Sequence, residues 1–190
     1  AAALEWRTLL RTVSGCNFLD TLQSAAAQLT TSNTQFHLYS DAALEGAVIP
    51  SLGGWFHGQW WAYPLAPCMY DVPISWWEFA AAAVNLIMFH HYVWGSSGSY
   101  SVAVGDTEVV LHVDGLATPL ILQRSSAKSI GLQYIHLKLK DTAAFEELAP
   151  VLAAAHCRGE RNVASDFASR GMYSELAKFS ATLGVTPVRL

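Results

Sequence analysis

Four acidic residues of this chain stand where elements of secondary structure are predicted to begin or end. Asp41 and Asp114 each follow a short apolar strand. Glu78 lies at the start of a long apolar helix, and Asp166 lies early in the closing helix. Carboxylates that converge on one small volume can hold two divalent cations about 4 Å apart, which clamp the attacking and leaving oxygens of a phosphodiester. The pattern therefore indicates metal-dependent phosphodiester hydrolysis.

Each of these acids also has a plainer interpretation. Asp41 and Asp114 could be ordinary strand-ending residues, and Asp166 could lie on a solvated helix face. Glu78 could be the reciprocal member of a capping box whose N-cap is Ser75. The joint placement favours a site, because acids are few in this chain and the two aspartates follow strongly apolar strands, where an unpaired carboxylate is costly.

The elements that must position these acids follow from hydrophobic period and turn residues. Strands are predicted over residues 35–40, 46–49 with 54–57, 59–64, 109–113 and 151–155. Helices are predicted from Ser75 through residues 79–92, within residues 127–148 and over residues 162–177. If the first and fourth strands are parallel neighbours, Asp41 and Asp114 emerge side by side at one edge of the sheet.

The resulting order is an antiparallel meander of three strands, then helix, strand, helix, strand, helix. This order predicts an α/β fold with a mixed five-stranded sheet, the meander plus parallel strands, flanked by helices. Residues 1–33 are predicted to be an N-terminal helical connecting segment, and residues 34–190 the main domain. Residues 95–101 are rich in Ser and Gly and predict a surface loop.

Composition and charge narrow the class of protein. Hydrophobic residues make up 52% of the chain and charged residues 14%, which excludes a disordered protein. The net charge of −4 alone opposes binding to nucleic acid, but residues 12–123 contain no Lys or Arg, whereas residues 124–189 contain nine of the eleven basic residues. If bound metal ions neutralise the acids of the first half, a polyanion such as nucleic acid can bind to the basic residues of the second half.

Cysteine usage and hydropathy bear on the compartment. The three cysteines form no metal-ligand spacing, and their odd number predicts reduced thiols inside a cell, in the cytoplasm or the nucleus. The apolar stretch over residues 79–89 is too short to cross a bilayer, so no membrane association is predicted. A start at Ala1 without an initiator Met or charged leader predicts a fragment of something larger.

The segments around the four acids resemble ribonuclease H domains of retroelements. Residues 39–42, Tyr-Ser-Asp-Ala, resemble the opening Thr/Ser-Asp-Ala-Ser strand, residues 74–80 the helix with the catalytic glutamate, and residues 110–114 the second aspartate strand. Residues 156–170, His-Cys-Arg-Gly-Glu-Arg-Asn-Val-Ala-Ser-Asp-Phe-Ala-Ser-Arg, are similar to the family's closing His, Gly, Asn, Ala-Asp, Ser-Arg signature with its spacing intact. The resemblance spans about residues 35–170 and is nearest to domains that follow the polymerase in retrotransposons.

The chain departs from the family pattern at a few positions. Ala43 and Leu44 replace a small polar residue, Gly115 stands where Asn is common, and Ser165 stands where Ala is usual. The spacing from Glu78 to Asp114 is long, and no separate basic handle helix is evident. None of these changes removes an expected metal ligand.

The resemblance implies an endoribonuclease that cleaves the RNA strand of RNA–DNA hybrids with two Mg²⁺ ions, for which Mn²⁺ can substitute. It further implies a reverse transcriptase, with the polymerase domain of the same polyprotein as partner. Asp41 would bridge both ions, Asp166 would help to hold the ion that activates water, and Glu78 with Asp114 the ion on the leaving side. His156 would carry a proton or aid product release, unless it is a loop histidine without a role.

Substrate contacts follow from the same resemblance. Hybrids are recognised through 2′-hydroxyls and groove shape. The candidates for phosphate contacts, each of which could also be a plain surface charge, are Arg124, Lys128, Arg158, Arg161 and Arg170. Asn162 could cap the last helix, contact the substrate, or do both.

Two other functions fit the same pattern. One is a non-catalytic copy of the fold that tethers a polymerase to its neighbour, which the retention of all four acids opposes. The other is an integrase or transposase core, whose acidic set usually ends with a glutamate and does not suit the signature over residues 156–166.

For two further groups of residues we prefer a structural interpretation to a functional one. His90, His91 and His112 predict no zinc site, because no Cys lies at ligand spacing and adjacent residues on a helix point in different directions. A group of tryptophans is predicted to pack in the core and not to stack on bases, and it comprises Trp55, Trp60, Trp61, Trp76 and Trp77.

Overall fold

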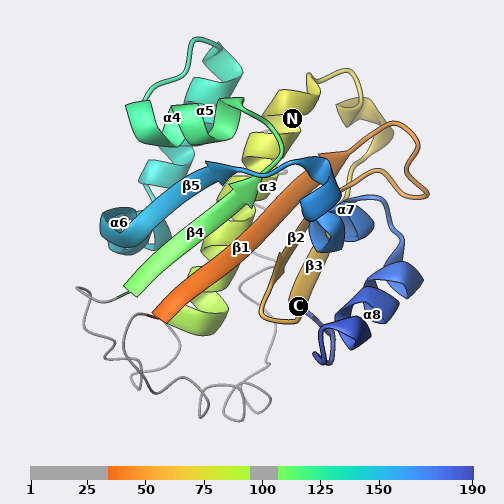
Figure 1. Ribbon diagram of the computed structural model, residues 1–190. Helices are drawn as coiled ribbons and strands as arrows, with labels where there is room; N and C mark the ends of the chain where they lie inside the picture. Colours follow the sequence, from red (N-terminus) through yellow and green to blue (C-terminus); the bar gives the residue numbers. More distant parts are fainter. Residues whose placement is uncertain (1–33, 95–106) are drawn as a thin grey trace.

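The computed structural model describes residues 34–94 and 107–190, so the expected connecting segment over residues 1–33 and the loop over residues 95–101 lie outside the described residues. The described chain forms one sheet with the strand order β5-β4-β1-β2-β3-β6 (Figure 1). The strands are β1 (Thr34–Ala43), β2 (Ser51–Phe56), β3 (Gln59–Pro64), β4 (Thr107–Val113), β5 (Leu152–His156) and β6 (Val188–Arg189). The α-helices are α3 (Ile74–Phe89), α4 (Ala117–Arg124), α5 (Ile130–Lys140), α6 (Ala143–Leu148), α7 (Val163–Ser169) and α8 (Tyr173–Thr182). Shorter helical turns are η1 (Pro67–Met69), η2 (His90–Trp94, a π-helix), η4 (Ala149–Val151) and η5 (Gly159–Arg161).

The sheet is mixed, as the sequence predicts. β1, β2 and β3 pair antiparallel as a meander, β4 pairs parallel with β1, and β5 pairs parallel with β4. The prediction of an α/β fold with a mixed sheet, an antiparallel meander plus parallel strands flanked by helices, is confirmed. The sixth strand was not predicted, because β6 has only two residues and shows no alternation. It pairs parallel with β3, and Arg189 lies over the rings of Trp60 and Tyr173.

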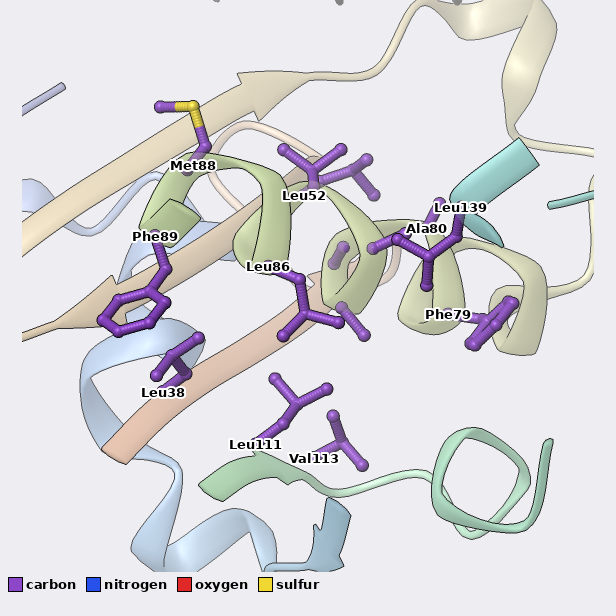
Figure 2. Packing of buried hydrophobic residues seen from close by; sticks show 14 of the residues in the cluster. Leu38, Leu52, Phe79, Ala80, Leu86, Met88, Phe89, Leu111, Val113 and Leu139 are labelled. Atoms are coloured by element: carbon purple, nitrogen blue, oxygen red, sulfur yellow. The ribbon is translucent and has the colours of Figure 1, made fainter. Parts of the chain in front are cut away.

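The main core lies between α3 and one face of the sheet (Figure 2). Leu38 of β1 and Leu111 of β4 are fully buried there, and each contributes roughly 1.5–3 kcal/mol to folding. The middle of α3 carries a run of alanines over residues 80–83, all buried. These small side chains let the helix lie close to its neighbours, and the larger side chains of Phe79 and Phe89, before and after the run, are also fully buried.

One buried polar side chain fixes α3 against the sheet. Asn85 donates its amide to the Tyr39 carbonyl of β1 over 3.0 Å and accepts the Trp61 indole N–H of β3 over 2.8 Å. Gly54 makes room for this pair, since a Cβ there would stand 2.3 Å from the indole nitrogen and 2.4 Å from the amide oxygen. The position of Glu78, in the second turn of the same helix, is thereby tied to β1.

The opposite face of the sheet carries α7, which packs on β1, β2 and β3 (Figure 1). The contact depends on Gly53, where a Cβ would stand only 2.5 Å from the backbone nitrogen of Ser169. The chain then turns at Gly171, whose φ of +72° favours glycine, and continues as α8. The predicted helix over residues 162–177 is therefore two helices.

Several other local predictions were wrong for local reasons. Residues 46–49 form no strand, because Gly46 has a φ of +66° and the amides of Val48 and Ile49 donate to the Arg170 carbonyl. The helical material over residues 127–148 divides into α5 and α6, with Thr142 accepting a capping bond from the Phe145 amide. α4 was not predicted.

The prediction of a capping box at the start of α3 was also wrong. The helix begins at Ile74 after Pro73, and no side chain caps its first turn. Pro73 already holds a backbone φ of −53°, so the chain can enter the helix there, and Glu78 is left free of a capping role.

Two of the five tryptophans that were predicted to pack in the core are buried. Trp60 and Trp61 are buried, whereas Trp55, Trp76 and Trp77 are partly buried and pack against the two hydrophobic clusters. Within residues 34–94 and 107–190, no helix combines the length and the apolar character needed to cross a membrane.

Candidate metal centre

Two of the four acids meet at the carboxyl ends of neighbouring strands. Ser40 of β1 pairs with Val113 of β4 in parallel register, so the following residues, Asp41 and Asp114, stand side by side. Because side chains alternate along a strand, both lie on the face opposite to Leu38 and Leu111, away from α3. The sequence could predict this neighbourhood only if β1 and β4 are adjacent, which the structure shows.

The other two acids approach the same place from helices. Asp166 lies in the first turn of α7, which packs on β1. Glu78 points its carboxylate at the turn after β4, where a Cβ on Gly115 would stand 2.2 Å from Oε2. The glycine that replaces the family's common Asn therefore makes room for this carboxylate. We call Asp41, Glu78, Asp114 and Asp166 the carboxylate centre.

Burial and mutual repulsion raise the pKa values of three of these groups. Asp41 is 5% exposed, and burial, with added repulsion from Asp114 and Asp166, raises its pKa to about 6. Burial, then the charges of Asp114 and Asp41, raise the pKa of Glu78 to about 7. Burial also raises the pKa of Asp114, to which Asp166 contributes. Negative charge is thus concentrated where it is costly, and a bound cation would relieve that cost.

Two side chains at the end of α7 contact the carboxylate centre. The Ser169 hydroxyl donates to Asp41 Oδ2 over 2.5 Å, and this bond partly offsets the rise in the Asp41 pKa. Arg170 donates from Nε to Asp166 Oδ1 over 2.6 Å, and its positive charge partly offsets the rise in the pKa of Asp114 that burial causes. Arg170 was predicted to contact phosphate, but its guanidinium is turned toward Asp166.

The donor set suits a hard divalent cation. All four groups offer carboxylate oxygens, which Mg²⁺ prefers. As the side chains stand, no group of three or more His, Cys, Asp or Glu among the described residues surrounds one point closely enough to hold an ion. Binding of an ion would therefore have to draw these carboxylates together.

Asn162 has a structural position that the sequence did not predict. It is 1% exposed, donates its amide to the Ser40 carbonyl over 3.0 Å and accepts the Ser165 hydroxyl over 2.5 Å. Its side chain makes no capping bond to α7, and burial removes it from contact with a substrate. Since Ser40 precedes Asp41, Asn162 fixes the strand that carries the central aspartate. Ser165, which departs from the family's usual Ala, completes this bond.

His156 and two basic residues lie at the rim. His156 is exposed at the end of β5 and is paired in register with Val113, the residue before Asp114. Arg158 and Arg161 are exposed at the two sides of η5. A Cβ on Gly159, between them, would stand 3.9 Å from Asp114 Oδ2, so this turn borders the carboxylate centre.

Arg124 and Lys128 lie on the segment that follows Asp114. Arg124 ends α4, Lys128 lies in the connection to α5, and both are exposed. Of the predicted phosphate contacts, Arg158 and Arg161 therefore lie beside the carboxylate centre. Arg124 and Lys128 lie at the end of α4 and in the connection to α5.

Sequence reasoning missed Ser169 as a direct partner of Asp41. The signal was available in the closing signature, where Ser169 lies one helical turn after Asp166 and therefore on the same side of α7. It could not be recognised from spacing alone, because the partner lies 128 residues away in the chain.

Comparison with known proteins gives a likeness only at the level of structure. No family model matches the chain, and no curated protein matches it. The ribonuclease H1 of the halophilic archaeon Halobacterium salinarum has a TM-score of 0.49 and 13% identity, over 70% of this chain and 93% of that one. LC11 ribonuclease H1 in complex with an RNA/DNA hybrid has a TM-score of 0.49 and 16% identity, over 70% and 92%. LC11 ribonuclease H1 isolated from compost has a TM-score of 0.48 and 14% identity, over 75% and 99%. These identities are too low for functional residues to be carried over.

Proposed function

We propose that this chain is a metal-dependent ribonuclease H, which cleaves the RNA strand of RNA–DNA hybrids. The observation that carries the proposal is the convergence of Asp41, Glu78, Asp114 and Asp166 at one end of the parallel strands β1 and β4, with three pKa values raised. Perturbed carboxylates gathered at a strand end are typical of catalytic sites. The signature over residues 156–170 supports hydrolysis of RNA in a hybrid over other phosphodiester chemistry.

The chain's own residues would hold the cations and orient the substrate. When bound, two Mg²⁺ ions, or Mn²⁺ in their place, would activate water and stabilise the charge that develops on the phosphate. Asp41 is the central ligand in this proposal, because Ser169 fixes its carboxylate and the charges of Asp114 and Asp166 act on it from two sides. Asp166 would serve the water side, and Glu78 with Asp114 the leaving side.

His156 would act as a proton carrier at the rim. It is exposed, and it pairs in register with Val113, the last residue of β4 before Asp114. An exposed histidine can turn toward the leaving oxygen and give it a proton, since imidazole gains and loses protons near neutral pH.

Recognition would depend on backbone contacts and not on base edges. Arg158 and Arg161 border the carboxylate centre and can pair with phosphates, while the 2′-hydroxyls distinguish the RNA strand. Low sequence specificity follows. The closing signature further supports a place in a retroelement reverse transcriptase, next to a polymerase domain, acting in the cytoplasm or the nucleus.

Cleavage of labelled RNA–DNA hybrid tests the proposal. The wild-type chain, Asp41→Asn and the matched control Asp71→Asn, an exposed acid outside the carboxylate centre, are incubated with hybrid and Mg²⁺ or Mn²⁺. We expect the wild type and the control to cut the RNA strand, and Asp41→Asn to lose at least about a hundredfold in rate, because a central ligand is gone. Hybrid bound but uncut by all three would indicate a tether, and cleavage of DNA strands an integrase or transposase core.

A further inference from the structure

Two histidines converge on the outer face of the sheet, in the part of β1 and β4 that leads to the carboxylate centre. His37 Nδ1 and His112 Nε2 lie 2.9 Å apart. In the parallel register His37 pairs with Val110 and Tyr39 pairs with His112, so the two histidines are diagonal neighbours on one face. They are 75 positions apart in the chain, and only the pairing of β1 with β4 brings them together, which is why the sequence alone predicted no metal site at His112.

The surroundings hold the pair in place and leave it accessible. Tyr39 stacks on His112 with ring centroids 4.6 Å apart and an interplanar angle of 14°, which fixes the orientation of that ring. The ring of His37 lies 5.2 Å from that of His112 at 27°. Both histidines belong to interior strands of the sheet, where the backbone is rigid, and His37 is exposed. A small ion can therefore reach a nitrogen pair that is already assembled.

The separation of the two nitrogens suits a shared metal ion. Imidazole nitrogen binds Zn²⁺ at about 2.0–2.1 Å, so two nitrogens on adjacent positions of one ion lie about 3 Å apart. We propose that His37 Nδ1 and His112 Nε2 form a binding site for a transition-metal ion such as Zn²⁺, Cu²⁺ or Ni²⁺. Imidazole favours these ions, whereas carboxylate oxygens favour Mg²⁺, so this histidine site differs in metal preference from the carboxylate centre.

The histidine site has two protein ligands and open positions. No third His, Cys, Asp or Glu among the described residues closes around the pair. Glu108 lies on the same face of β4, but its carboxylate accepts a hydrogen bond from Gln35 over 2.6 Å. Water or an exogenous donor would complete the coordination, as in sites that bind a ligand through the metal. Without metal, the same two nitrogens share one hydrogen bond.

Copper binding in the presence of excess Mg²⁺ tests the proposal, because Mg²⁺ occupies oxygen ligands and leaves imidazoles free. Cu²⁺ is titrated into the full chain and followed by electron paramagnetic resonance, which counts bound nitrogens. We expect one Cu²⁺ with two nitrogen ligands in the wild type. His37→Gln and His112→Gln should lose the two-nitrogen signal and bind at least about tenfold more weakly, since even partners of metal ligands are worth that much.

The matched control is His91→Gln, which removes an exposed histidine of η2 and should leave the two-nitrogen signal unchanged. If a glutamine variant does not fold, the imidazole resonances of the wild type are followed during Zn²⁺ titration, and those of His37 and His112 should shift first. A single-nitrogen signal in the wild type, unchanged binding in both variants, or first shifts at other histidines would overturn the proposal.

Discussion

Asp41 is the residue on which the carboxylate centre depends most. Its side chain is 5% exposed, lies beside two other acids and has the Ser169 hydroxyl as a direct partner. Burial of a carboxylate without a neutralising charge is unfavourable, so the metal-free protein carries a local cost that a bound cation would remove.

The free energy of unfolding of the metal-free protein should therefore depend on pH through Asp41. Its pKa is raised from 3.8 to about 6, so the folded state binds more protons than the unfolded state between these values. The stability contributed by the protonated group is present below pH 4 and is lost as pH rises through about 6, by at most about 3 kcal/mol. The Asp41→Asn variant keeps an oxygen acceptor for the Ser169 hydroxyl. Its free energy of unfolding, measured in urea, should rise relative to that of the wild type as the pH increases from 4 to 8.

The exposed acid Asp71 supplies the control for this measurement. Asp71→Asn should follow the wild type at every pH. A constant difference between Asp41→Asn and the wild type across the window, or a gain that appears only at acid pH, would mean that the Asp41 charge is not costly in the folded protein.

Ser169 should position the Asp41 carboxylate for the cation. Ser169→Ala removes a hydrogen bond to a charged group, of a kind that contributes roughly 1.5–3 kcal/mol, and should raise the Mg²⁺ concentration for half-maximal cleavage about tenfold. Titration calorimetry with Mg²⁺ checks the affinity without an activity readout. Ser180→Ala, a buried serine of α8 whose hydroxyl has no partner among the described residues, is the control. Equal Mg²⁺ affinity in both variants would remove Ser169 from this role.

At the scale of elements, the packing of α7 on β2 brings Asp166 and Ser169 to Asp41. Gly53 permits this approach, since α7 backbone atoms stand where its Cβ would be. On the other face, Asn85 ties α3 to β1 and β3, and so places Glu78. The carboxylate centre thus brings together side chains from the ends of two neighbouring strands and from helices on both faces of the sheet.

Gly53→Ala should push α7 from the sheet. We expect a loss of about 1–3 kcal/mol in the free energy of unfolding, because an added methyl group overpacks a backbone contact. The same shift moves Asp166 from Asp41, so calorimetry should also show weaker Mg²⁺ binding. Gly159→Ala is the stability control, since its Cβ would meet only ordinary contact at 3.9 Å. An unfolding midpoint equal to that of the wild type would show that α7 is not held through Gly53.

The sequence predicted the elements that carry strong patterns. β1 and β4 were found because their apolar runs are short and end in aspartate, and α3 because its apolar run is long. The divisions at Thr142 and Gly171 were missed because they depend on a single turn each. Contacts between distant residues, such as Ser169 with Asp41, required the three-dimensional packing.

At the scale of the whole molecule, charge is divided along the chain. Residues 12–123 contain no Lys or Arg and supply three of the four acids of the carboxylate centre, whereas residues 124–189 contain nine Lys or Arg. The sequence predicted this division from composition. Arg170 is used within the protein, on Asp166 four residues earlier, a pairing that the i,i+4 spacing within a helix would have indicated.

Hybrid binding should therefore weaken as salt concentration rises, because basic side chains release counterions from the phosphates. Arg158→Ala should reduce the slope of log affinity against log salt concentration by about 1 and weaken binding to all sequences alike. Fluorescence anisotropy with labelled hybrid, using Asp41→Asn in each background to prevent cleavage, measures the slope. Lys178→Ala, an exposed lysine of α8, should leave it unchanged. Equal slopes for both variants would exclude Arg158 from phosphate contact.

The most direct test of the carboxylate centre is the location of bound Mn²⁺ by anomalous diffraction from crystals of the chain with RNA–DNA hybrid. The account predicts two peaks about 4 Å apart, ligated by Asp41, Glu78, Asp114 and Asp166. It also predicts that both peaks vanish or weaken in Asp41→Asn. Mn²⁺ bound elsewhere in crystals whose four carboxylates carry no anomalous peak would contradict it.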